Sequence, residues 1–107
     1  MKEFAYLERI ELSNFAGREF SRTGMSELLE GISFLPCIRA VVLRNNGIDD
    51  SYVEEVEALF RNQMIKSIDL SQNKLRRVAS SVGKLMKSEV NHVQWLDLSQ
   101  NEFERDF

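Results

Sequence analysis

The side chains that most often perform nucleophilic or metal chemistry are scarce in this sequence. Cys37 is the only cysteine and His92 is the only histidine. Cys37 has no nearby histidine to activate its thiol, and His92 has no cysteine or carboxylate at metal-ligand spacing. A nucleophile, a base and an orienting group cannot be assembled from these residues. We therefore expect no catalytic residues, no cofactor, no bound metal and no enzymatic activity.

Composition and charge limit the partners that the chain can bind. Its 107 residues are 43% hydrophobic and 29% charged, which is typical of one globular domain. The net charge of -3 leaves no excess of Lys and Arg, which disfavours nucleic acid and membrane surfaces as partners. The single cysteine, the lack of Asn-x-Ser/Thr acceptors and the lack of a signal-peptide or membrane-spanning apolar run favour an intracellular, cytoplasmic location.

The polar side chains that could bind a partner belong to a string of residue types that recurs along the chain. Residues 65–75 give the best copy, and residues 93–103 repeat it with apolar residues at the same first, fourth, sixth and eleventh places. Residues 38–48 form a third copy, and residues 7–12 begin a fourth. The fourth-place residues are separated by 31, 27 and 28 positions: Ile10, Val41, Ile68 and Leu96.

This string resembles the leucine-rich-repeat consensus, and a spacing near 28 is similar to the ribonuclease-inhibitor-like subclass. The resemblance implies an α/β fold, a short right-handed leucine-rich-repeat solenoid with parallel strands on the concave face and helices on the convex face. It implies one domain over residues 1–107 with strand units at 7–17, 38–48, 65–75 and 93–103. The first unit is atypical, because Phe15 and Gly17 stand where the consensus has Asn and an apolar residue. Whether the chain is a fragment of a longer protein stays open.

Hydrophobic periodicity predicts the elements that would form these units. Short strands with one buried face are favoured by alternating apolar residues at Val41 and Leu43, Ile68 and Leu70, and Leu96 and Leu98. Between the strands the period changes to about 3.6, which predicts helices over residues 24–33, 49–62 and, more weakly, 76–87. Ser51 with Glu54 is typical of a capping box at the start of the second helix.

The resemblance implies which residues face outward and which hold the turns together. The ninth-place asparagines would turn inward as a structural ladder: Asn46, Asn73 and Asn101. The outward strand positions would form the concave binding face: Glu11, Arg39, Val42, Arg44, Lys66, Asp69, Gln72, Trp95, Asp97 and Gln100. Trp95 is the first candidate for an interface anchor, with packing beneath a C-terminal element as the alternative. The acids could meet a basic partner or simply be solvated, and the basic residues could pair with them across strands.

The leading hypothesis is a non-enzymatic protein–protein interaction module that binds another protein through the concave strand face or the uncapped C-terminal end. Self-association through the C-terminal edge is a related hypothesis, because the sequence stops soon after the strand that contains Trp95. An RNA or ribonucleoprotein adaptor is an alternative, motivated by Arg39, Arg44 and Lys66. Regulation of a small GTPase is a further alternative, by analogy with longer arrays of the same subclass.

Overall fold

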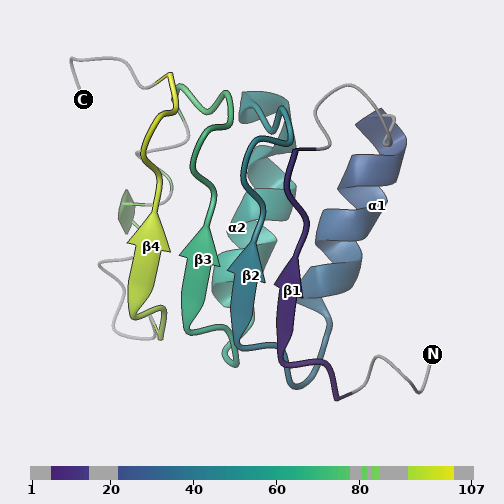
Figure 1. Ribbon diagram of the computed structural model, residues 1–107. Helices are drawn as coiled ribbons and strands as arrows, with labels where there is room; N and C mark the ends of the chain where they lie inside the picture. The colour runs from purple at the N-terminus through teal and green to yellow at the C-terminus, as the bar shows by residue number, and fades with distance from the viewer. Residues whose placement is uncertain (1–5, 15–21, 78–80, 82, 85–91, 103–107) are drawn as a thin grey trace.

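The structure is a computed structural model that describes residues 6–14, 22–77, 81, 83–84 and 92–102. Its named elements follow one another along the chain as β1 (Arg9–Glu11), α1 (Arg22–Ser33), β2 (Ala40–Val42), η2 (Asp50–Tyr52), α2 (Val53–Arg61), β3 (Ser67–Asp69) and β4 (Trp95–Asp97). Helices α1 and α2 cover the same side of the sheet, and the other side of the sheet carries no helix among the described residues (Figure 1).

The four strands form one parallel sheet in the order of the sequence, β1-β2-β3-β4. Their register matches the repeat position for position: Ile10 pairs with Val41, Val41 with Ile68, and Ile68 with Leu96. Each strand is therefore displaced from its neighbour by one whole repeat, with no slip that would turn a buried side chain outward. The predicted α/β class with parallel strands is confirmed.

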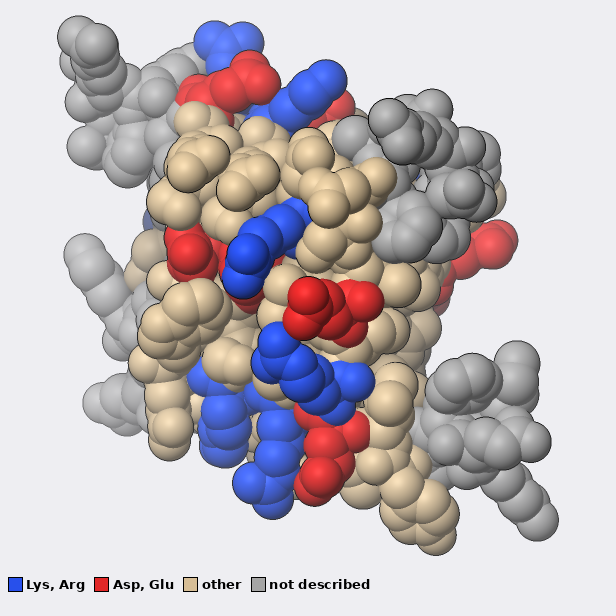
Figure 2. All heavy atoms as spheres, in the orientation of Figure 1, with Lys and Arg blue, Asp and Glu red and all other residues tan. Residues whose placement is uncertain are grey.

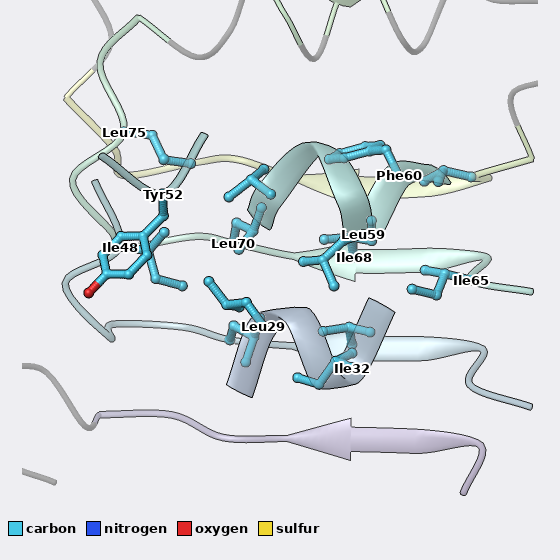
Figure 3. Close-up of a cluster of buried hydrophobic side chains, with 14 of the residues drawn as sticks. Leu29, Ile32, Ile48, Tyr52, Leu59, Phe60, Ile65, Ile68, Leu70 and Leu75 are labelled. Carbon is cyan, nitrogen blue, oxygen red and sulfur yellow. The ribbon is translucent and has the colours of Figure 1, made fainter. Parts of the chain in front are cut away.

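The core lies between the sheet and the two helices. Alternate strand residues such as Val41 and Ile68 point towards the helices and are completely buried. Helical spacing places Leu29 and Ile32 of α1 on one stripe, and the same spacing gives α2 the buried residues Val56, Leu59 and Phe60. These side chains form one continuous apolar cluster (Figure 3). The cluster joins buried side chains of α1, β2, α2 and β3.

Helix α1 and the helical segment formed by η2 and α2 agree with the predicted spans to within two residues, and α2 ends at Arg61 instead of residue 62. Helix α1 begins at Arg22 instead of residue 24, and the second helical segment opens with the short 3₁₀ turn η2 before α2. The predicted capping box is wrong. The residue that caps this helix start is Asp49, whose carboxylate accepts a hydrogen bond from the backbone N–H of Ser51. An aspartate at this place also suits the positive end of the helix dipole.

Several predictions concern residues that the structure does not describe. Phe15 and Gly17 of the atypical first unit lie outside the described residues. So does most of the predicted helix over residues 76–87, of which only Arg76, Arg77, Ser81, Gly83 and Lys84 are described. These expectations stay predictions.

Two residues predicted to be exposed on the strand face are buried. Val42 has 6% of its surface exposed and Asp69 has 1%. Both lie on inner strands, where a neighbouring strand about 4.8 Å away flanks them on each side. The side chain of Arg44 also reaches over the face to the carboxylate of Asp69. Val42 and Asp69 are therefore supports of the strand face and do not offer free surface to a partner.

Candidate functional site

Asn73 fixes the turn that follows β3. Its Oδ1 accepts hydrogen bonds from the N–H groups of Asn46 at 2.9 Å and Ile48 at 3.1 Å. Its Nδ2 donates to the carbonyl oxygens of Leu43, Leu70 and Ser71. These backbone groups follow the ends of short strands, beyond the hydrogen bonds of the sheet. Leaving one of them buried and unpaired would cost about 1–3 kcal/mol. Asn73 thus satisfies the backbone of its own unit and of the unit before it.

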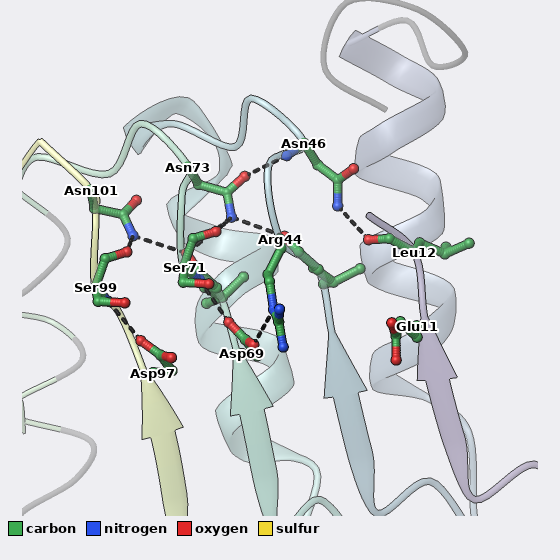
Figure 4. Close-up of polar contacts among 12 residues, drawn as sticks. Glu11, Leu12, Arg44, Asn46, Asp69, Ser71, Asn73, Asp97, Ser99 and Asn101 are labelled. Atoms are coloured by element: carbon green, nitrogen blue, oxygen red, sulfur yellow. Dashed lines mark hydrogen bonds and ion pairs between the residues drawn. The ribbon is translucent and has the colours of Figure 1, made fainter. Parts of the chain in front are cut away.

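The other two asparagines make the equivalent contacts one unit away on either side. Asn46 Nδ2 donates to the carbonyl oxygen of Leu12 at 2.7 Å, and Asn101 Nδ2 donates to that of Leu70 at 2.9 Å. The Oδ1 of Asn101 accepts from the N–H of Leu75 at 3.0 Å. Figure 4 shows the three amides in a row along the ends of the strands. The row of amides therefore fixes the turns that follow β2, β3 and β4 at equivalent positions.

Left-handed backbone positions follow the strands and turn the chain away from the sheet. They are Asn14, Asn45, Gln72 and Gln100, with φ between 54° and 68°. Asparagine adopts this region more readily than other non-glycine residues, and Asn45 is further held by a hydrogen bond from its Nδ2 to Asn14 Oδ1 at 2.9 Å. Gln72 and Gln100, both predicted binding residues, are exposed at these turns.

The three acids of the predicted column differ in their surroundings. Glu11 on the edge strand β1 is exposed and its Oε1 lies 2.9 Å from Arg9 Nη2. Asp97 on β4 is half-buried and accepts a hydrogen bond from the N–H of Ser99 at 2.9 Å. Asp69 on the inner strand β3 accepts from the N–H of Ser71 and lies 2.7 Å from Arg44 Nε (Figure 4). Only Glu11 and Asp97 can present a carboxylate to a partner.

The surroundings of Asp69 keep its carboxylate ionised. Burial opposes the charge, but the N–H and hydroxyl of Ser71 and the guanidinium of Arg44 outweigh burial and hold the pKa of Asp69 below its usual value. The pKa of Arg44 is raised in turn, first by its hydrogen bond to Asp69. Asp69 and Arg44 therefore form a fixed ion pair across β2 and β3.

The three basic candidates do not form a free positive patch. Arg44 is paired with Asp69, and the Nε of Arg39 lies 4.0 Å from Glu8 Oε1. Lys66, directly before β3, is half-buried, and its backbone N–H donates to the carbonyl oxygen of Arg39, directly before β2. Figure 2, which looks onto the strand side, shows positive and negative side chains interspersed. The observation that motivated RNA binding is weakened by these ion pairs.

Trp95 is the largest exposed apolar side chain on the described part of the sheet, with 52% of its surface exposed. The strand register places it beside Ser67, followed by Ala40 and Arg9 along the same column. The two inner positions of this column carry small side chains, so one side of the indole is not covered by a bulky neighbour. A partner can therefore contact the indole and the two small residues together.

Cys37 and the potential metal ligands are side chains that could support chemistry other than binding. The thiol of Cys37 is half-buried. Among the residues that the structure describes, no group of three or more His, Cys, Asp or Glu side chains could hold a metal ion. Within that same part of the chain, no helix is long and apolar enough to cross a membrane.

Comparison with solved structures shows that another protein has a similar fold. The chain matches no family model and no curated protein. A solved structure titled "Leiomodin-1 Actin-Binding Site 2 (ABS2)" has a similar fold, with a TM-score of 0.73 over 88% of this chain and 16% sequence identity. The chain spans about half of that solved chain, since the match covers 53% of it. The similarity shows a shared arrangement of strands and helices.

Proposed function

We propose that this chain is a leucine-rich-repeat solenoid of the ribonuclease-inhibitor-like type and a non-enzymatic module that binds another protein through its strand face. The family assignment is supported by the in-register parallel strands and by three asparagines that bond to equivalent carbonyl groups one unit back. A parallel sheet with one side free of helices is unusual outside such arrays, and that side is the one that repeat proteins offer to partners.

The exposure of Trp95 is the observation that carries the functional proposal. Tryptophan is enriched among the few residues that supply most of the energy of an interface. Here 52% of Trp95 is exposed at the end of a column of small residues, with the half-buried carboxylate of Asp97 two positions along the same strand. Glu11, Gln72 and Gln100 add exposed polar groups around this column. Together they form a surface on which one exposed aromatic side chain is accompanied by polar groups.

Photo-crosslinking tests the strand face whatever the identity of the partner. A photoreactive phenylalanine analogue at position 95 should crosslink to a protein in an extract of the source cells, and excess unlabelled wild-type chain should suppress the adduct. The Trp95→Ala chain should compete at least about tenfold less well. Tyr6→Ala removes another exposed aromatic ring and should compete like the wild type. Equal competition by Trp95→Ala would show that the strand face is not the binding surface.

Actin is the first individual partner to test, because the solved chain of similar fold is titled an actin-binding site. Calorimetric titration of monomeric actin into the wild-type, Trp95→Ala and Tyr6→Ala chains separates the possibilities. Binding that only Trp95→Ala weakens would identify actin as a partner of the strand face. The absence of heat and of co-sedimentation with filaments would exclude actin but leave the crosslinking test of the strand face independent.

Self-association through β4 is the alternative use of this end of the sheet. Strand β4 pairs only with β3 among the described residues, so its other edge offers unpaired backbone groups to an added strand. Sedimentation equilibrium at high micromolar concentration would reveal such a dimer. A monomer at all concentrations would remove this alternative.

A further inference from the structure

A groove runs between α1 and α2, on the helical side of the sheet. It consists of two adjoining hollows of about 290 and 310 Å³ that share Ser33, Phe34 and Ala58. We call these residues, with Glu30, Glu54 and Glu55, the α1–α2 groove. Both helices pack on the same face of the sheet (Figure 1), so the groove is separate from the strand face that contains Trp95.

Phe34 is held in this groove with 77% of its surface exposed. The buried stripe of α1 ends at Ile32, and Phe34 falls in the turn directly after the helix, off that stripe. The side chain of Asn62 donates to the carbonyl oxygens of Ser33 at 2.9 Å and Leu35 at 3.0 Å, on both sides of Phe34. The N–H of Phe34 also donates to Gly31 at 3.2 Å. The backbone of Phe34 is thus fixed, and its exposed ring does not result from a loose turn.

The groove also concentrates negative charge. Glu30, Glu54 and Glu55 line the first hollow, and no basic side chain among the described residues forms an ion pair with any of them. Ser26 donates to Oε1 of Glu55 at 2.8 Å, while Oε2 of the same carboxylate is shielded from water and accepts no hydrogen bond from the described residues. Arg61 lies at the far end of the groove, and its Nη2 is 3.9 Å from Glu57 Oε2.

We propose that the α1–α2 groove binds a protein segment that presents a lysine or arginine next to an apolar side chain. The apolar side chain would pack on Phe34 and Ala58, which together give a small apolar surface. The cation would lie at the exposed carboxylates of Glu30 and Glu54, beside Glu55, none of which has an ion-pair partner among the described residues. These carboxylates are not grouped closely enough to hold a metal ion. The positive charge is therefore expected on a side chain of the bound segment, next to the apolar side chain that packs on Phe34.

Two peptides of identical length and apolar pattern test this proposal. One contains lysines and leucines, and the other has each lysine replaced by glutamate. Both are titrated into the isotope-labelled full chain while its backbone amide signals are recorded by NMR. The lysine peptide should shift the signals of Ser33, Phe34 and Ala58 in a saturable manner and should weaken with added salt. The glutamate peptide should cause no shifts.

Matched variants separate this groove from general attraction of a basic peptide to an acidic protein. Phe34→Ala and Glu54→Lys should each weaken binding about tenfold. Tyr6→Ala removes another exposed ring, and Glu102→Lys makes the same charge change at an exposed site on another part of the chain; both should bind like the wild type. Equal loss in Glu54→Lys and Glu102→Lys, unchanged binding in Phe34→Ala, or shifts centred on Trp95 would each overturn the proposal.

Discussion

At the scale of single residues, the side chain of Asn73 forms hydrogen bonds with five backbone groups in two units. Asn73→Ala removes the amide that forms these bonds. Because Asn73 has only 4% of its surface exposed, the N–H and C=O groups would stay buried without a hydrogen-bond partner. We expect the free energy of unfolding to fall by about 3 kcal/mol. Urea denaturation followed by circular dichroism would measure this loss.

Two further variants calibrate the Asn73 measurement. Asn101→Ala should cost less, because Asn101 is only half-buried and, within the described part of the chain, its Oδ1 accepts from one N–H, that of Leu75. Lys74→Ala changes an exposed side chain and should lie within about 0.5 kcal/mol of the wild type. If Asn73→Ala were as mild as Lys74→Ala, the hydrogen bonds of the asparagine row would not hold the turns together.

The ion pair of Asp69 with Arg44 predicts a dependence of stability on pH. Because the pKa of Asp69 is lower in the folded chain, its contribution is fully present above the unfolded pKa of about 4 and is lost as the pH falls towards the folded pKa. Wild type should therefore exceed Asp69→Asn in free energy of unfolding at pH 7, and the difference should shrink below about pH 4. A difference that stays constant over that range would contradict the ionised state of Asp69.

The residues of the strand face could be predicted only in part. The repeat gives the position of each side chain along its strand, and this is sufficient to place Trp95, Glu11 and the two glutamines on the surface. The repeat does not show whether a side chain from one unit extends across the sheet to cover a residue of the next unit. Asp69 stands at the same place in the repeat as Asp97, yet among the described residues only Asp69 has an ion pair with an arginine, Arg44 in the turn after β2, and a described strand on both sides. Burial of Asp69 is therefore a property of the assembled sheet.

At the scale of elements, the start of the second helical segment depends on Asp49. Its Oδ1 accepts from the N–H of Ser51 at 3.0 Å and also from the hydroxyl of Ser51. Asp49→Ala should lower the free energy of unfolding by about 1 kcal/mol, because the N–H then loses its partner. Ser51→Ala leaves that N–H paired and should cost less. Thermal unfolding of both variants would decide, and a larger loss in Ser51→Ala would restore the capping box predicted from the sequence.

The elements themselves were largely predictable, because their periods are strong and their lengths short. Alternation over three residues is sufficient to predict a strand when the same pattern recurs four times in register. The apolar residues of α2 have helical spacing and do not fit the alternation of a strand. The α1–α2 groove was missed. Phe34 comes two residues after the buried stripe of α1, so its exposure could have been predicted from the sequence. The hydrogen bonds from Asn62 that fix its turn could not, because they join residues far apart in the sequence.

At the scale of the whole molecule, the inner strands are better protected than the outer ones. Two of three residues in β2 and in β3 are buried, whereas β1 and β4 have none that are fully buried. In an array stabilised by contacts between neighbouring units, the ends open first. Amide hydrogen exchange under native conditions should therefore be faster at Ile10 and Leu96 than at Val41 and Ile68. Uniform protection across all four strands would instead mean that the sheet opens only as one unit.

The equal register of all three strand pairs has a consequence for how such a chain changes length. Because Ile10, Val41, Ile68 and Leu96 occupy the same place in successive units, copying the coding segment for one complete unit would add a strand whose side chains meet both neighbours correctly. A gain or loss of one codon within a strand would instead turn that strand's apolar side chains outward. Insertion of a whole unit therefore preserves the side-chain alternation of the sheet, whereas insertion of one residue within a strand does not.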